Sequence, residues 1–409
     1  MIREVKLKSY VALLALLSLL VSFAACLLVS AQTPLPQQQQ RPRLAGSVRP
    51  APEMAGASSP ADEEVDENDV VRVNTQLITV PVVVRDHEGR PVTGLTASAF
   101  QLYEDNLPQR VETFATSDAP YEVALLLDTS GSTRAEIALI RSAACAFIES
   151  LRPDDRVAVL SFNTTEEGWE KLATVGVQSY LTNDREVLLR AVQNIGASNG
   201  TPYYDALERV VQDIFRDPPQ PERRGRRALV ALSDGVDSTS ISGFASVRAH
   251  FLESGLLAYF VQLNTEDYVE DRLLADCQDD RTLRLAPAQL ERYRRTFDPR
   301  ADRADYADFC LLGSFERMAI SRSLYRLARQ EMDQLARDTG GRTFQATDLY
   351  AARTAFAEVA AEIGRQYSLG YYSTNKSRDG RYRQIRVDVR GITGAQVSAR
   401  EGYKTTQGE

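Results

Sequence analysis

The fold of this chain is decided by one stretch, Val123-Ala124-Leu125-Leu126-Leu127-Asp128-Thr129-Ser130-Gly131-Ser132. Its apolar beginning is followed by an acid and then by two serines at alternate positions. A short apolar run bounded by polar residues is typical of a buried strand in a parallel sheet. Because open α/β folds bind their ligands where such strands end, we expect Asp128, Ser130 and Ser132 at a binding edge.

These three side chains are hard oxygen donors. Hard oxygens at close spacing suit Mg²⁺, Mn²⁺ or Ca²⁺ better than zinc or copper. Asp and Ser are also common helix caps and turn residues, so capping is the alternative interpretation of this pattern. A metal site requires further ligands from elsewhere in the chain.

Two later segments offer such ligands. Asn199–Leu207 reads as a loop that contains Thr201 and leads into a helix, with Pro202 suited to its first turn. Ala228–Gly235 reads as a second apolar strand that ends in Asp234. The order Asp-x-Ser-x-Ser, loop Thr, strand-end Asp resembles the metal-ion-dependent adhesion site of von Willebrand factor type A domains. This resemblance implies a site for Mg²⁺ (or Mn²⁺ or Ca²⁺) made by Asp128, Ser130, Ser132, Thr201 and Asp234.

Apolar strands and helical patterns alternate through residues 120–366. The alternation predicts an α/β fold with a doubly wound, mostly parallel sheet, as in type A (Rossmann-like) domains. The last helix of the alternation, 351–363, is expected to be able to couple to the metal site, as in some type A domains. A charged segment at about 265–323 interrupts the alternation and is expected to be an insertion, either a recognition element or a loop without function. We hypothesise a disulfide between Cys277 and Cys310, whereas Cys145 is expected in the core.

The flanks of this domain predict β-structure. Residues 71–119 show period-two alternation, as at Ile78, Val80 and Val82, and predict a small β-domain. Residues 367–409 predict a C-terminal β-hairpin that packs with it, because neither piece has enough core alone.

The N-terminus predicts export. Residues 1–31 combine a basic start with a long uncharged apolar run, which is typical of a signal peptide or an uncleaved signal anchor, and Cys26 leaves a lipoprotein site open. Residues 32–70 are rich in Pro and Gln and predict a disordered linker. The remaining chain is therefore expected in the periplasm, at the cell surface or secreted, with membrane contact only through the N-terminal segment.

Composition and motifs argue against two function classes. The formal net charge of -8 argues against a nucleic-acid partner. The only histidines, His87 and His250, lie in segments that we do not expect near the site, and the chain lacks hydrolase, zinc-protease and phosphate-loop motifs. We therefore do not expect an enzyme.

Residues 75–404 also resemble the VWFA-related Acidobacterial domain proteins, a secreted bacterial family. The matching stretches include Leu126–Ser132, Gln366–Tyr372 and Ala399–Tyr403. Together, the two resemblances imply an extracytoplasmic, metal-dependent protein-binding or adhesion module whose cation bridges to an acidic residue of a protein partner. The alternative is an envelope scaffold in which the metal only stabilises loops.

Overall fold

A computed structural model describes residues 77–116, 120–133, 137–167, 170–217, 226–274 and 283–405. The expected signal segment (1–31), the linker (32–70) and Cys277 lie outside these residues. In the part of the chain that is described, no helix is both long and apolar enough to cross a membrane.

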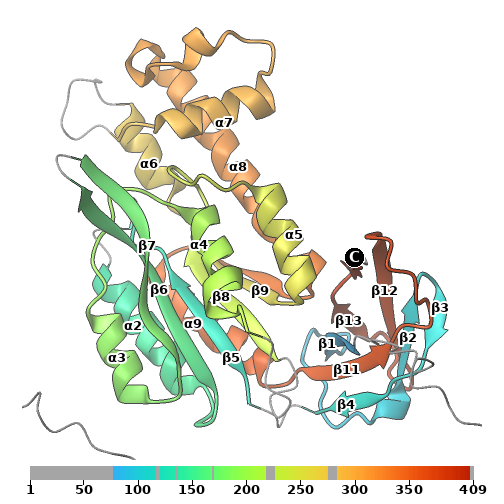
Figure 1. Ribbon diagram of the computed structural model, residues 1–409. Helices are drawn as coiled ribbons and strands as arrows, with labels where there is room; N and C mark the ends of the chain where they lie inside the picture. The colour runs from blue at the N-terminus through green and yellow to red at the C-terminus, as the bar shows by residue number, and fades with distance from the viewer. Residues whose placement is uncertain are drawn as a thin grey trace, which may run out of the picture. The chain divides into compact units, whose positions relative to one another are not determined.

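A six-stranded sheet forms the centre of the α/β part (Figure 1). Every neighbouring pair is parallel except β6 and β7, and the buried apolar strand β5 lies inside the sheet. This arrangement confirms the predicted α/β fold with a mostly parallel sheet. In spatial order the strands are β10 (Arg342–Ala346), β9 (Leu257–Leu263), β8 (Arg227–Ser233), β5 (Glu122–Leu127), β6 (Arg156–Glu167) and β7 (Glu170–Thr182).

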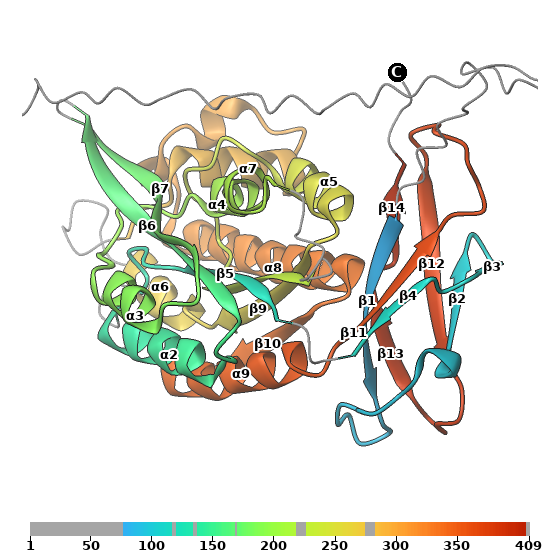
Figure 2. The same cartoon turned by 60° about the horizontal axis from the view of Figure 1, so that its bottom comes forward.

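Helices cover both faces of this sheet (Figure 2). Because strand residues alternate between faces, Leu125 packs in one apolar cluster and Leu126 in the other. The first cluster includes α2 (Ile137–Ser150), α3 (Arg185–Gln193) and α9 (Leu349–Ile363). The second includes α4 (Tyr203–Arg209) with the π-helix η4 (Val210–Ile214), α5 (Phe244–Ser254) and the C-terminal half of α8 (Ser314–Thr339). Cys145, which we expected in the core, is partly buried and packs against the first cluster.

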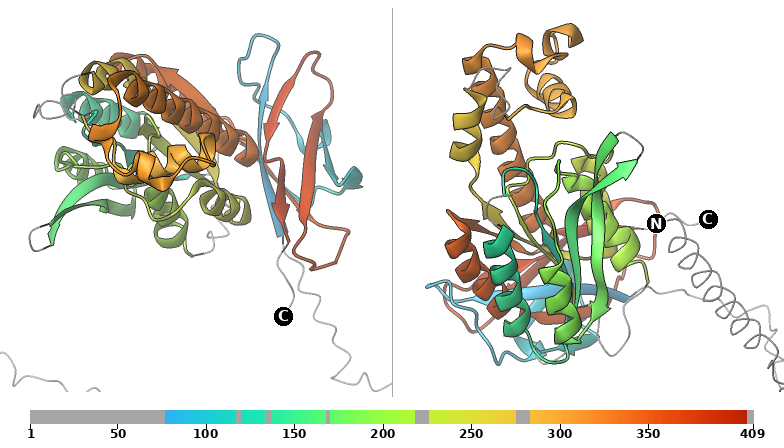
Figure 3. Two further views of the ribbon diagram at one scale, coloured as in Figure 1. Left: turned by 90° about the horizontal axis from the view of Figure 1, so that it is seen from above. Right: turned by 90° about the vertical axis from the view of Figure 1, so that its left-hand side faces the viewer.

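The insertion is a folded helical unit (Figure 3). It contains α6 (Glu266–Leu273), α7 (Pro287–Phe297), η6 (Arg303–Tyr306) and η7 (Phe309–Leu311), which share an apolar cluster with the first turns of α8. No helix boundary marks the predicted end of the insertion near residue 323, because α8 runs without a break for 26 residues from Ser314. Cys310 is disulfide-bonded.

The chain flanks form two four-stranded antiparallel sheets around one apolar cluster. In one sheet the order is β13 (Gln396–Ala399), β1 (Leu77–Arg85), β11 (Tyr367–Tyr372) and β4 (Thr113–Ala115). In the other it is β14 (Gly402–Lys404), β12 (Tyr382–Val389), β2 (Phe100–Glu104) and β3 (Leu107–Gln109). The expected pairing of the two flanks is therefore observed.

The predicted C-terminal hairpin is wrong. Its two strands, β11 and β12, lie in different sheets. β11 is buried at five of its six positions and lies between β1 and β4, whereas β12 alternates between buried and exposed residues. A real hairpin joins β2 to β3, where Asp105 and Asn106 both have positive φ (47° and 65°), as a type I′ turn requires.

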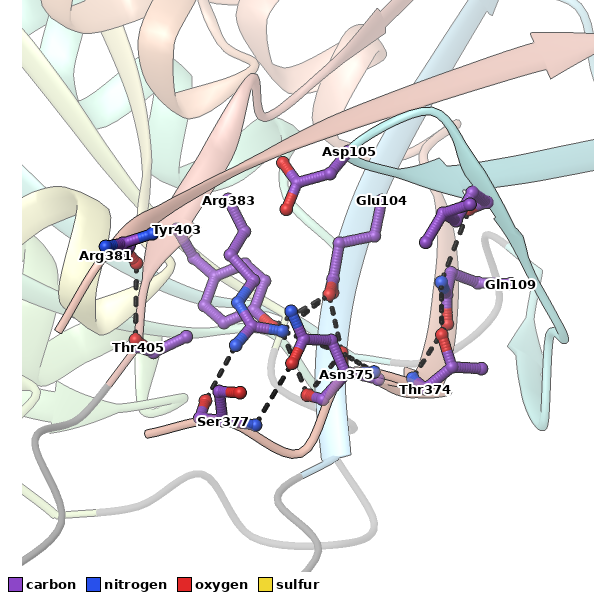
Figure 4. A network of polar contacts seen from close by, with 12 residues as sticks. Glu104, Asp105, Gln109, Thr374, Asn375, Ser377, Arg381, Arg383, Tyr403 and Thr405 are labelled. Atoms are coloured by element: carbon purple, nitrogen blue, oxygen red, sulfur yellow. Dashed lines mark hydrogen bonds and ion pairs between the residues drawn. The ribbon is translucent and has the colours of Figure 1, made fainter. Parts of the chain in front are cut away.

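A buried polar network joins these two sheets (Figure 4). The Glu104 carboxylate on β2 accepts hydrogen bonds from Tyr371 Oη (2.6 Å), Tyr403 Oη (2.9 Å), Ser373 Oγ (2.5 Å) and Arg383 Nη1 (3.0 Å). Burial would raise the pKa of Glu104, but these donors lower it below the ordinary value of 4.5. The charge of this carboxylate is thus fully compensated inside the protein.

Candidate metal centre

The two predicted acidic ligands follow neighbouring parallel strands. β5 pairs with β8 so that Leu127 lies opposite Leu232, and the backbone N–H of Asp128 donates to the Leu232 carbonyl at 2.9 Å. Asp234 comes directly after β8. The carboxyl ends of the two strands therefore bring Asp128 and Asp234 to the same edge of the sheet.

Asp128 is fully buried and is held by its own loop and by β8. One carboxylate oxygen accepts from the backbone N–H of Ser130 (2.9 Å), as in an Asx turn, and the other accepts from Ser233 Oγ (2.6 Å). The Thr133 hydroxyl donates to the carbonyl oxygens of both Asp128 and Ser130 at 3.1 Å. The turn interpretation is therefore correct for one oxygen of Asp128, but it does not explain the contacts on the serines.

A row of hydroxyl groups connects the two acidic residues. Ser130 Oγ lies 3.1 Å from Ser132 Oγ, and Ser132 Oγ donates to Asp234 Oδ2 at 3.2 Å. Four of the five predicted ligands thus form one hydrogen-bonded group.

Thr201, the fifth predicted residue, lies in a neighbouring loop and is 7% exposed. Its backbone N–H donates to Ser238 Oγ (2.8 Å), and its carbonyl accepts from the Ser238 N–H (3.0 Å). Asp237 accepts from the Tyr203 N–H at 2.9 Å and strengthens the same connection. The Thr201 loop is therefore fixed to the loop that follows Asp234, although no hydrogen bond joins Thr201 to the other four residues.

Sequence reasoning missed three polar residues of the site. Ser233 holds Asp128, whereas Thr265 Oγ1 donates to Asp234 Oδ2 at 2.6 Å and lies 2.7 Å from Tyr325 Oη. The Ser-Asp pair at the end of β8 was a usable signal for Ser233. No sequence signal pointed to Thr265 and Tyr325, because they lie at the two ends of the insertion.

Residues 123–236 match the von Willebrand factor type A domain family. The chain contains a von Willebrand factor type A domain. The matched range runs from β5 through β8 and includes all five predicted ligands.

Solved structures of this family are similar to the chain at low identity. A von Willebrand factor type A protein from Catenulispora acidiphila is 12% identical, with coverage of 82% of this chain and 75% of that one and a TM-score of 0.36. The vWF domain of the type V pili tip protein Mfa5 from Porphyromonas gingivalis is 17% identical (29% and 39% covered, TM-score 0.24). The SpRpn10 VWA domain is 12% identical (35% and 75% covered, TM-score 0.28). No curated protein matches the chain. The family assignment therefore rests on the matched range rather than on these structures.

The two buried carboxyls of the candidate site both have raised pKa values. Burial raises the pKa of Asp128, and the charge of Asp234 raises it further. Burial likewise raises the pKa of Asp234, although hydrogen bonds from Thr265 and the Val236 N–H oppose the shift. Apart from burial, the main groups that act on these two carboxyls are hydroxyls, backbone amides and, for Asp128, the charge of Asp234, and none of these groups is a cation.

The donor set fits a hard divalent cation. In the described part of the chain, no three His, Cys, Asp or Glu side chains gather as a metal cluster, so the other oxygen donors here would be the hydroxyls of Ser130, Ser132 and Thr201. Two buried carboxylates without a cation partner are costly in a folded protein, and a divalent cation would remove that cost. A cavity of about 240 Å³ adjoins the site, with Asp234, Tyr325 and Arg329 in its lining.

Proposed function

We propose that this protein is an extracytoplasmic protein-binding module that depends on a divalent cation, Mg²⁺ or else Mn²⁺ or Ca²⁺. Asp128, Ser130, Ser132, Thr201 and Asp234 would hold the cation. The observation that carries the proposal is the buried Asp128–Asp234 pair, for which hydroxyls and backbone amides, and no cation, are the main partners among the described residues. When bound, the cation would supply the positive charge that an acidic residue of a protein partner recognises.

The composition of the site favours an external carboxylate. Only two of its five proposed donors are charged, so the protein would balance a divalent cation without surplus negative charge. A third carboxylate from the protein would repel that of the partner. The neutral serine and threonine hydroxyls are therefore suited to a cation that must still attract an acidic group.

The proposal includes an extracytoplasmic location and membership of the VWFA-related Acidobacterial domain family. The apolar N-terminal segment supports export, and the motifs shared with the secreted Acidobacterial proteins agree with it. The type A domain itself supports a protein-interaction role.

The first test is calorimetric titration of Mg²⁺ and Mn²⁺ into the chelator-treated protein. We expect saturable binding at one site that Asp128→Ala abolishes. Asp388→Ala is the matched control. Asp388 is a half-exposed acid of the β-domain that pairs with Arg386, and it is not one of the proposed ligands. A wild-type protein that binds neither metal would refute the proposal.

A second test asks whether a partner joins the metal. Wild-type protein and Thr201→Ala would be used to capture proteins from an envelope extract, with Mg²⁺ or with chelator. We expect capture that requires both the metal and Thr201. Equal capture under all conditions would favour the envelope-scaffold alternative, in which the metal only stabilises loops.

A further inference from the structure

The insertion meets the candidate metal centre at both of its ends. Thr265 immediately precedes α6, and Tyr325 lies on α8, sixty residues later. Thr265 Oγ1 donates to Asp234 Oδ2 at 2.6 Å, and Tyr325 Oη lies 2.7 Å from Thr265 Oγ1 and 3.5 Å from Asp234 Oδ2. The base of the insertion is therefore attached to one carboxylate oxygen.

The direction of these hydrogen bonds is determined by their protons. Thr265 has one hydroxyl proton and donates it in the hydrogen bond to Asp234. In its contact with Tyr325, the Thr265 oxygen must therefore accept, and Tyr325 donates. Each bond in such a chain polarises the next toward the carboxylate. Tyr325 is 4% exposed, so these hydrogen bonds are protected from competing water on the α8 side.

Thr265 also gives up its usual local role. It is the N-cap residue of α6, yet its side chain makes no capping hydrogen bond. A threonine at this position normally accepts from a backbone N–H of the first turn. The hydroxyl donates to Asp234 instead. Thr265 therefore orients a residue of the candidate site rather than capping its own helix.

The insertion also supports the second oxygen of Asp234. Asp234 Oδ1 accepts from the backbone N–H of Val236 at 3.0 Å. The Val236 side chain packs against the apolar cluster of the insertion, which includes Leu273 and Leu324. Each carboxylate oxygen of Asp234 therefore accepts at least one hydrogen bond from a residue that belongs to the insertion or packs against it.

We propose that the insertion sets the affinity of the metal site, with Thr265 as the positioning residue for Asp234 and Tyr325 as its support. The inference rests on the proposed function, because it requires that the site bind a cation. Groups that hydrogen-bond a metal-ligating carboxylate fix its orientation and tune the affinity for the metal. The coupling is reciprocal, so metal binding should in turn stabilise the base of the insertion.

Calorimetric titration of Mg²⁺ into the full chain tests the inference. We expect Thr265→Val to weaken Mg²⁺ binding about 10–100-fold, Tyr325→Phe to weaken it less, and Thr265→Ser to restore it. Thr343→Val and Tyr306→Phe are the matched controls. The first removes a buried hydroxyl that has no partner, and the second removes one that bonds Asp298 inside the insertion. Both controls should bind as the wild type does.

Hydrogen exchange supplies the second readout. In the wild type, Mg²⁺ should slow exchange in α6 and in residues 314–325, and Thr265→Val should lose most of that protection. A Thr265→Val protein that binds Mg²⁺ as tightly as the wild type, or more tightly, would overturn the inference while leaving the proposed function intact. A wild type that binds no Mg²⁺ would overturn both.

Discussion

Two of the regions in which the protein buries carboxylates surround them in opposite ways. In the β-domain, Glu104 receives four hydrogen bonds, one of them from the buried guanidinium of Arg383. At the edge of the α/β sheet, Asp128 and Asp234 lie close enough to raise the pKa of Asp128, and hydroxyls and amides are their main partners. The pKa of Glu104 is lowered, whereas those of the two aspartates are raised.

This difference separates a structural acid from a candidate ligand. A buried charge that has its own counter-charge and a full set of donors stabilises the fold that supplies them. A buried pair of like charges without a counter-charge makes the fold less stable until a cation binds. Burial alone would not distinguish the two regions, because all three carboxylates are at most 3% exposed.

The largest effect is expected from removing the counter-charge of Glu104. Arg383→Met should lower the free energy of unfolding by about 3–5 kcal/mol, because it leaves a buried carboxylate without its cation. Urea unfolding with chelator present measures this. Arg386→Met is the matched control on the same strand, since Arg386 is half-exposed and its pair with Asp388 should contribute about 0–1 kcal/mol. Equal losses in the two variants would contradict the comparison.

A smaller effect, of opposite sign in the two regions, is expected from the exchange of carboxylate for amide. Glu104→Gln should destabilise the protein by about 2 kcal/mol, because the amide loses the charge-assisted bond from Arg383 and presents donors to donors. Asp128→Asn should stabilise the metal-free protein by about 1 kcal/mol, because it removes repulsion from Asp234. Urea unfolding at pH 8 with chelator compares the two. A loss of stability in both variants would show that Asp128 is a structural acid like Glu104.

The smallest effect is a difference in pH dependence. Asp128 has a raised pKa in the folded state, so above about pH 4 the folded state holds more protons than the unfolded chain and stability falls as the pH rises. Glu104 has a lowered pKa, so its contribution is present above pH 4.5 and is lost as the pH falls. In chelator, Asp128→Asn should therefore flatten the alkaline decline by about 1 kcal/mol, whereas Glu104→Gln should flatten only the acid side. Unfolding midpoints measured from pH 3.5 to pH 8 test this prediction. If Asp128→Asn loses stability toward alkaline pH as steeply as the wild type does, the prediction is wrong.

Local sequence patterns were sufficient to predict the mostly parallel sheet and most of the residues that meet at the candidate site. The apolar run of β5 and the similar run of β8 each end in the residues that the structure brings together, because parallel neighbours share an edge.

Long-range pairing was not readable in the same way. Residues 366–372 and 383–389 have the sequence patterns of two strands with a turn between them. The local sequence does not indicate that β11 pairs with β1 and β4 rather than with β12. Thr265 and Tyr325 were missed for the same reason. A threonine before a helix predicts a cap, and only the fold of the whole insertion shows that its hydroxyl serves Asp234.

The pairing of β1 with β11 has a consequence for the order of folding. Leu77 lies opposite Tyr372, and the whole type A domain is contained between them in the sequence. A chain that is synthesised from its N-terminus must therefore keep the apolar strand β1 without its partner until almost the last strands have been made. Unpaired apolar strands are prone to aggregate, so we expect the protein to be vulnerable to aggregation until residue 372 has emerged.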